Sequence, residues 1–273
     1  MHLPVRTFAD VCEELARRCT VLPLAEMATA LSAGRRLPEN AAAITFDDGY
    51  ASVHDLALPV LKKLGLPATV FVTTGFVDGD CPLWFQQVEL LSKRAEPRRE
   101  LEALKLLPNQ ELRNHVATLE SAAGGSPELP EHMKPLSWDQ VRRLCASGLV
   151  EVGGHTHTHP ILARCRLEEQ RWEIAKCRDR ISSETGRCPV LFAYPNGGSG
   201  DYMPATVDSL AEAGFQFACT TSNGRASPAS DPFELPRYGA PESRWEAAAT
   251  VSGAFEIVKE WRQRGRNQPG GQP

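Results

Sequence analysis

The chain alternates short apolar segments with longer segments that have the periodicity of an amphipathic helix. The apolar segments lie at residues 42–46, 68–74, 150–154, 190–194 and 215–221. They are apolar almost throughout rather than at every second position, which is typical of parallel strands covered on both faces. The alternation therefore predicts an α/β fold in which helices cover a parallel sheet.

The helical segments support the same architecture. They lie at residues 8–19, 56–65, 137–148, 166–186, 204–214 and 244–265. Most of them end at or beside a glycine, which readily adopts the left-handed conformation common at a helix C-terminus. We expect Trp172 and Trp261, on two of these helices, to lie in the core. The length of 273 residues is close to the roughly 250 residues of one α/β barrel, so residues 1–273 are expected to form a single domain.

One long segment interrupts the alternation. Residues from about 82 to about 135 are charged and mostly helical in pattern, and they close with glycine and proline residues. This composition predicts a helical insertion between two strands. The chain from about residue 265 onwards is rich in glycine and polar residues and is expected to be a flexible tail.

The composition narrows the possible functions. The formal net charge of -4 provides no basic surface, so no nucleic-acid partner is expected. No window approaches the roughly 18 consecutive apolar residues of a transmembrane helix, and the N-terminus has the pattern of a helix rather than of a signal peptide. The chain as written is therefore expected to be cytoplasmic, with an extracytoplasmic location open if its N-terminus is incomplete. The eight cysteines are scattered, which favours free thiols over a disulfide framework.

Two polar motifs follow predicted strands. In HTHTHP, His155 and His159 are four residues apart, a spacing that turns two imidazoles to one side of a helix or tight loop. In DDGY, Asp47 and Asp48 are adjacent, so their side chains are expected to point in different directions. One carboxylate could bind a metal while the other acts as a base. Together the motifs predict an open site of two histidines and one carboxylate, suited to metal-assisted hydrolysis.

The segments TFDDGY (residues 45–50) and HTHTHP (residues 155–160) resemble the first two motifs of the polysaccharide deacetylase family, the NodB-like domain of carbohydrate esterase family 4. The similarity extends to PATVFVTTGFV and to FAYPNGG. The resemblance implies a distorted (β/α) barrel of about seven parallel strands. It also implies that a metal-bound water removes acetyl groups from an N-acetylated sugar or polysaccharide.

The resemblance further implies a role for individual residues. Asp47 matches the general base, and the residues that match the ligands of a divalent metal, Zn²⁺ in the first instance, are Asp48, His155 and His159. Asn196 matches the residue whose backbone N–H stabilises the oxyanion. The residues expected beside the glycan substrate are Tyr194, Pro195, Leu235 and Trp84. For Trp84, packing of the insertion against the barrel is the alternative.

The chain also departs from the family pattern. The arginine of the third motif is replaced by Ala193, and no histidine follows His159 to act as a general acid. Three interpretations stay open. Arg237 of ELPRYG orients Asp47 while Asp47 itself or water returns the proton, His157 or Tyr194 donates the proton, or the site is weak or inactive. The alternative functions are an esterase that removes O-acetyl groups from xylan and a catalytically weak glycan-binding homologue.

Overall fold

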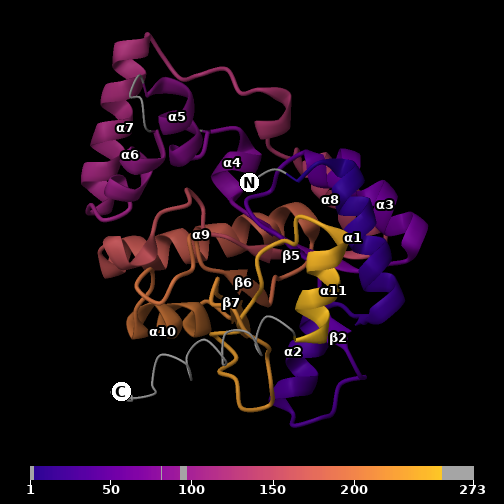
Figure 1. The fold of residues 1–273 in the computed structure, drawn as a ribbon. Helices are drawn as coiled ribbons and strands as arrows, with labels where there is room; N and C mark the ends of the chain where they lie inside the picture. Colours follow the sequence, from indigo (N-terminus) through magenta and orange to yellow (C-terminus); the bar gives the residue numbers. More distant parts are fainter. Residues whose placement is uncertain (1–2, 81, 93–96, 254–273) are drawn as a thin grey trace, which may run out of the picture.

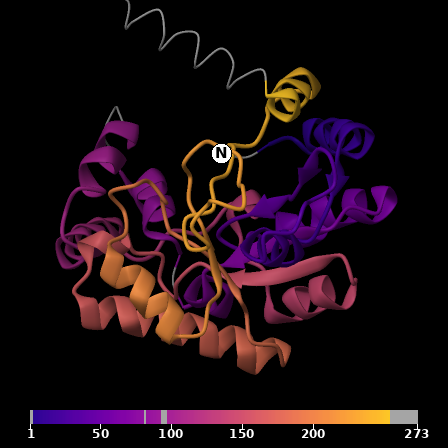
Figure 2. The same cartoon turned by 90° about the horizontal axis from the view of Figure 1, so that it is seen from below.

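A computed structural model describes residues 3–80, 82–92 and 97–253. Its main sheet has five parallel strands that neighbour one another in chain order, and it curls into a half-barrel (Figures 1 and 2). The strands are β3 (Thr45–Phe46), β4 (Ala68–Val72), β5 (Val150–Gly154), β6 (Leu191–Ala193) and β7 (Phe217–Cys219). The predicted α/β class and the parallel sheet are thereby confirmed.

The prediction of about seven strands in one barrel is not met, because only five of the described strands form the main sheet. Two further strands, β1 (Thr20–Val21) and β2 (Ala41–Ala42), pair with each other in a separate parallel sheet. The apolar segment 42–46 is therefore divided between β2 and β3. The separation has a local cause, because Leu22 donates to the carbonyl of Ala42 while Thr69 donates to the carbonyl of Ile44, so the segment pairs with β1 at its start and with β4 further on.

Five of the six predicted helices are present within a few residues of their expected ends. The helices and single helical turns are α1 (Val5–Arg18), α2 (Leu24–Ser32), η1 (Val53–Ala57), α3 (Leu58–Leu64), α4 (Thr74–Asp78), α5 (Trp84–Leu91), α6 (Pro97–Leu104), α7 (Asn109–Ala123), η2 (Glu131–Met133), α8 (Trp138–Ala146), η3 (Leu162–Arg164), α9 (Leu167–Thr185), α10 (Pro204–Glu212) and α11 (Arg244–Ser252). The segment predicted as helical at residues 244–265 is described as far as Gly253, which ends α11 with a φ of 75°. The predicted tail and Trp261 lie outside the described residues.

The core explains why the strands are apolar on both sides. Val70 and Val72 of β4 face helices, in a cluster with residues such as Leu61 and Leu144. Phe71, between them, faces the inside of the half-barrel, where it packs with Leu191. Every residue of β4 is buried. A strand covered on both faces needs apolar side chains at successive positions, which is why no alternation is visible in the sequence.

Three of the α-helices between β4 and β5 lie in the segment where an insertion was predicted. Figure 1 shows α5, α6 and α7 grouped at one end of the molecule, beyond α9. They enclose an apolar cluster of their own, which contains Trp84, Val88, Leu104, Leu112 and Val116. These three helices therefore share a small core of their own.

The expectation that Trp172 belongs to the core is wrong, because this side chain is 51% exposed. The buried positions of α9 include Gln170, Glu173 and Ile174, so Trp172 lies on the helix beside its buried face. The described cysteines, which are all residues of this type except Cys81, are free thiols as predicted.

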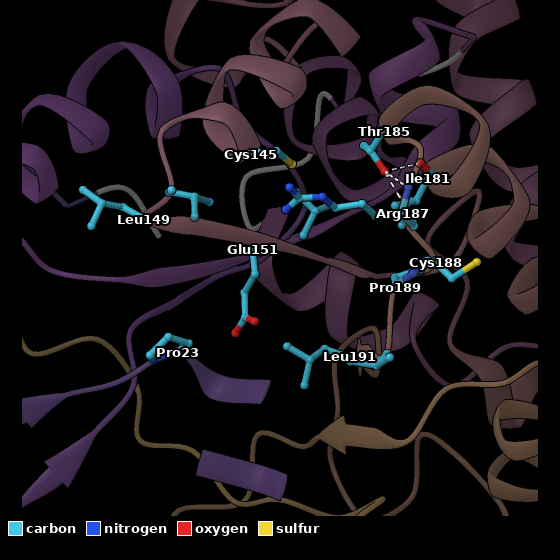
Figure 3. Close-up of a pocket in the computed structure, with 14 residues that line it drawn as sticks. Pro23, Cys145, Leu149, Glu151, Ile181, Thr185, Arg187, Cys188, Pro189 and Leu191 are labelled. Carbon is cyan, nitrogen blue, oxygen red and sulfur yellow. Dashed lines mark hydrogen bonds between the residues drawn. The ribbon is translucent and has the colours of Figure 1, made fainter. Parts of the chain in front are cut away.

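A cavity of about 300 Å³ lies at the amino-terminal ends of β5 and β6 (Figure 3). It is lined by the first residues of β5 and β6, among them Glu151 and Leu191. One oxygen of Glu151 accepts hydrogen bonds from the Thr69 hydroxyl (2.7 Å) and the Ala25 N–H (3.1 Å), so this carboxylate ties β4 and β5 to the start of α2. In the described part of the chain, no helix is long and apolar enough to cross a membrane.

Candidate metal centre and catalytic site

The carboxyl ends of the strands bring the two predicted motifs together. Asp47 and Asp48 directly follow β3, and His155 directly follows β5. Because the strands are parallel, their carboxyl ends lie at the same edge of the sheet, as in other α/β barrels. Asp48 has a left-handed backbone with a φ of 72°, and its side chain turns toward the histidines while Asp47 turns toward the chain beyond β7.

Asp48, His155 and His159 form a compact group of possible ligands. The Asp48 Oδ1 atom lies 3.4 Å from His155 Nε2 and 3.3 Å from His159 Nε2. One ligand atom from each residue lies within 4.8 Å of the others. Both histidines are buried, whereas the Asp48 side chain is partly exposed. The donor set of two imidazole nitrogens and one carboxylate oxygen is one that binds zinc and related divalent ions.

The hydrogen bonds of His155 test whether a cation fits this site. His155 Nδ1 donates to the Ala193 carbonyl at 2.7 Å, so a neutral ring presents the lone pair of Nε2 to the Asp48 carboxylate. A lone pair and an anion repel each other unless a proton or a metal lies between them. Burial opposes ionisation at both residues, but their contact outweighs it: the pKa of Asp48 is lowered and the pKa of His155 is raised. The group therefore suits a bound cation.

The second histidine, His159, is contacted by residues of α5. His159 has a left-handed backbone with a φ of 62°, and its carbonyl accepts a hydrogen bond from the Trp84 indole N–H at 3.2 Å. Its ring packs edge-on against Phe85, with 5.2 Å between the ring centres. Trp84 is only 8% exposed and belongs to the core of the insertion. Trp84 therefore packs among α5, α6 and α7 and supports a candidate metal ligand through its indole N–H. Its role beside the substrate stays a prediction.

Asp47 forms a two-pronged ion pair with Arg237. The two guanidinium NH groups donate to the two carboxylate oxygens at 2.8 Å and 2.9 Å. Arg237 is itself fixed by hydrogen bonds to the Thr220 carbonyl (3.0 Å) and the Thr45 hydroxyl (3.1 Å). Burial acts to raise the pKa of Asp47, but the neighbouring charges, Arg237 foremost, bring it below its usual value. The pair keeps Asp47 ionised and fixed in direction.

Arg237 reaches this position because the chain beyond β7 returns to the sheet. Leu235 bridges to Cys219 in a parallel sense, and its N–H donates to the Ala218 carbonyl. The Leu235 side chain is 5% exposed and packs in the inner core. Leu235 is therefore placed in the core, where it carries Arg237 to the edge of the sheet.

The segment after β6 contains the other predicted residues. Tyr194 is 1% exposed, donates its hydroxyl to the Phe233 carbonyl at 3.0 Å and stacks on Tyr202. Pro195 is buried and Asn196 is exposed. Asn196 has a φ of 62°, and its side chain donates to Asp201. Within the described residues, no hydrogen bond uses the Asn196 backbone N–H.

His157 and Glu173 complete the surroundings of the histidine motif. The His157 ring is turned away from the ligand group, since its Nδ1 contacts the Thr74 hydroxyl at 2.8 Å and its edge packs against Trp172. Glu173 of α9 is 0% exposed and binds the loop at His157 and Thr158. Sequence reasoning missed Glu173, because α9 has polar residues all round and no pattern marks one of them.

The fold and site define a class of protein: an α/β half-barrel whose carboxyl edge carries two histidines and one carboxylate that could hold a metal, beside a second carboxylate. The family model described as polysaccharide deacetylase matches residues 34–218. The chain therefore belongs to the polysaccharide deacetylase family, as the two motifs suggested. YxkH of Bacillus subtilis (strain 168), named for the same family, is 22% identical over 202 residues, which are 74% of this chain and 52% of YxkH. The chain thus spans about half the length of that curated relative.

Solved structures show the same fold. The Streptococcus pyogenes deacetylase PplD, in complex with acetate, superposes with a TM-score of 0.66 at 19% identity, covering 91% of this chain and 87% of PplD. IcaB from Ammonifex degensii gives a TM-score of 0.65 at 24% identity, covering 90% of this chain and 88% of IcaB. The de-N-acetylase from Aggregatibacter actinomycetemcomitans gives 0.61 at 18% identity, covering 87% and 86%. At these identities the likeness establishes the fold.

Proposed function

We propose that this protein is a metal-dependent hydrolase that removes N-acetyl groups from an N-acetylated sugar or polysaccharide. The observation that carries the proposal is the group of Asp48, His155 and His159 beside an ionised Asp47. A site of this kind needs a cation holder and a separate base, and the two adjacent aspartates divide these tasks. The names of the solved relatives, which include a deacetylase bound to acetate and a de-N-acetylase, support the acetyl group as the target.

In this proposal a divalent ion, Zn²⁺ in the first instance, is held by Asp48, His155 and His159. Such an ion acidifies water and polarises a carbonyl oxygen. Asp47 takes a proton from the attacking water, and its pair with Arg237 keeps it ionised and aimed. The backbone N–H of the exposed residue Asn196, which has no partner among the described residues, donates to the oxyanion. Loss of one such donor costs about 3 kcal/mol in other acyl-transfer enzymes.

The return of a proton to the leaving nitrogen is assigned to Asp47. A guanidinium stays protonated at the pH of catalysis and is a poor acid, so Arg237 cannot replace an imidazole. The His157 ring and the Tyr194 hydroxyl are engaged with Thr74 and Phe233. Asp47 carries the abstracted proton and lies beside the ligand group, so it is the residue best placed to release it.

The second candidate function is removal of O-acetyl groups, as from xylan. The observation that favours it is the lack of any histidine after His159, since an alkoxide leaves with less help from an acid than an amine does. The same three ligands and the same base would serve both reactions. The leaving group alone separates them.

The test is acetate release by metal-reconstituted protein from N-acetylglucosamine oligomers and, in parallel, from acetylated xylan. We expect release from the oligomers, loss of release in Asp48→Ala, and full release in Asp139→Ala, which removes an exposed carboxylate on α8. Release from xylan alone would favour the esterase. Binding of oligomers without release from either substrate would favour a glycan-binding homologue.

A further inference from the structure

The loop that carries the histidines is held in an unusual backbone conformation. Thr156 and His159 both have left-handed backbones, with φ values of 63° and 62°. For residues with a Cβ this region costs about 1–2 kcal/mol each. Such conformations persist only where the surrounding structure enforces them. The neighbours that hold the loop therefore decide where the two imidazoles point.

One of these neighbours is a buried carboxylate on the far side of the loop. Glu173 Oε2 accepts hydrogen bonds from the backbone N–H groups of His157 and Thr158, both at 2.8 Å. Its other oxygen accepts the Thr158 hydroxyl at 2.5 Å. Successive N–H groups beside a left-handed residue form a concave anion-binding nest. In this chain a side chain of α9 fills the nest, and Glu173 is 0% exposed.

The other contacts of the loop do not use the N–H groups of His157 and Thr158; His155 N–H donates to the Val72 carbonyl and His159 N–H to the Thr156 hydroxyl. From the β4 and α4 side, the Thr73 hydroxyl donates to the His155 carbonyl (3.0 Å) and the Gly75 N–H donates to the His157 carbonyl (2.8 Å). These two contacts bind carbonyls of the loop, whereas Glu173 of α9 accepts from the N–H groups of His157 and Thr158. Without Glu173, two adjacent N–H groups would lose their acceptor, and the loop could relax toward ordinary backbone angles.

We propose that Glu173 is a positioning residue for the metal site: its carboxylate holds residues 155–159 in the turn that brings both imidazoles to Asp48. This inference rests on the metal site of the proposed function. Groups that orient metal ligands from behind typically change metal affinity by about 10–100-fold when they are removed. Glu173 acts through the backbone of the loop and touches neither the ligand atoms nor the substrate.

A purely structural role is the competing explanation, and the same helix offers a matched control. Gln170 is also 0% exposed. It donates to the Cys165 carbonyl at 3.1 Å and accepts the Thr206 hydroxyl at 2.6 Å. Gln170→Leu therefore removes a buried polar group of similar size from α9 without touching the histidine loop.

The experiment measures the affinity of the metal-stripped full chain for Zn²⁺ and the visible spectrum of its Co²⁺ form. We expect Glu173→Leu to weaken Zn²⁺ binding by about 10–100-fold and to alter the Co²⁺ spectrum. Glu173→Gln, whose amide oxygen can still accept both N–H groups, should recover most of the affinity. Gln170→Leu should stay within about twofold of wild type despite a comparable loss of thermal stability. Wild-type affinity in Glu173→Leu, or an equal loss in Gln170→Leu, overturns the proposal.

Three further outcomes have defined meanings. If Glu173→Leu does not fold, Glu173→Asp replaces it: the shorter side chain should weaken Zn²⁺ binding relative to Glu173→Gln, and wild-type affinity in both variants overturns the proposal. If the wild type binds Zn²⁺ but releases no acetate, the proposed function fails and Glu173 keeps its role. If the wild type binds no divalent ion, the test is amide hydrogen exchange at residues 155–159. Glu173→Leu should speed this exchange and Gln170→Leu should not. Unchanged exchange in Glu173→Leu overturns the proposal.

Discussion

The pair between Arg237 and Asp47 leads to a quantitative prediction for Arg237→Ala. The substitution removes both guanidinium hydrogen bonds, at 2.8 Å and 2.9 Å, from the proposed base. It leaves the three candidate ligands untouched. Arg237 therefore offers a way to change the orientation and charge of Asp47 without changing the group that would hold the metal.

The size of the effect follows from the geometry. Opposite charges about 4 Å apart interact by about 4 kcal/mol at an effective dielectric constant of 20. The Arg237 side chain is 14% exposed and the Asp47 side chain 33% exposed, so solvent screening reduces this to about 2 kcal/mol. If catalysis needs the whole interaction, kcat should fall roughly 30-fold. KM should change little, because Arg237 contacts the base and not the substrate in this proposal.

The pH dependence should change in a defined direction. Asp47 must be ionised to act as a base, so activity is present above its pKa and is lost below it. Burial acts to raise the pKa of Asp47, and Arg237 is the first of the charges that lower it. Removing Arg237 leaves the effect of burial, so the pKa should rise. The acid limb of the kcat/KM profile should therefore move to higher pH in Arg237→Ala.

The assay is steady-state acetate release across pH, with two control variants. Arg237→Lys keeps the charge but loses the two-pronged geometry, so its acid limb should lie between those of wild type and Arg237→Ala. Arg180→Ala breaks a comparable pair between Arg180 of α9 and Asp78 of α4, to which Trp138 of α8 also donates. This variant should lower stability without changing kcat. An unchanged kcat in Arg237→Ala, together with complete loss of activity in Asp47→Asn, would refute the orienting role.

Three further predictions concern the surroundings of the site and the core. Trp84→Phe keeps most of the packing but loses the donor to the His159 carbonyl, so Zn²⁺ affinity should fall roughly 10-fold; wild-type affinity in a titration would contradict this. Gly153→Ala places a Cβ 2.6 Å from a ring carbon of Phe71, so the free energy of unfolding in urea should fall by about 1–3 kcal/mol. An unchanged urea midpoint would show that Phe71 shifts without cost. The exposed Cys188 should react with a thiol reagent in the native protein, while Cys177, whose pKa burial raises to about 12, should react only after unfolding.

Much of the fold and of the metal group could be predicted from local pattern. Unbroken apolar segments indicate parallel strands, and parallel strands bring residues that follow them to one edge of the sheet. Asp48 and His155 are therefore brought together although about a hundred residues separate them. The motifs also identified Asp47 as a candidate base. These features depend on residue types at fixed spacing, which a sequence displays directly.

Tertiary structure alone decided which partners support these residues. The pattern left three interpretations of the missing general acid, one of them with Arg237 orienting Asp47. The pairing of Leu235 beside β7 brings the Arg237 guanidinium to Asp47. Glu173 lies on a helix with no marked polar face, and the exposure of Trp172 on that helix was predicted wrongly. Contacts of this kind depend on how a helix is rotated and on where a distant loop returns. Neither is encoded in the spacing of neighbouring residues, because both are set by packing across the whole sheet.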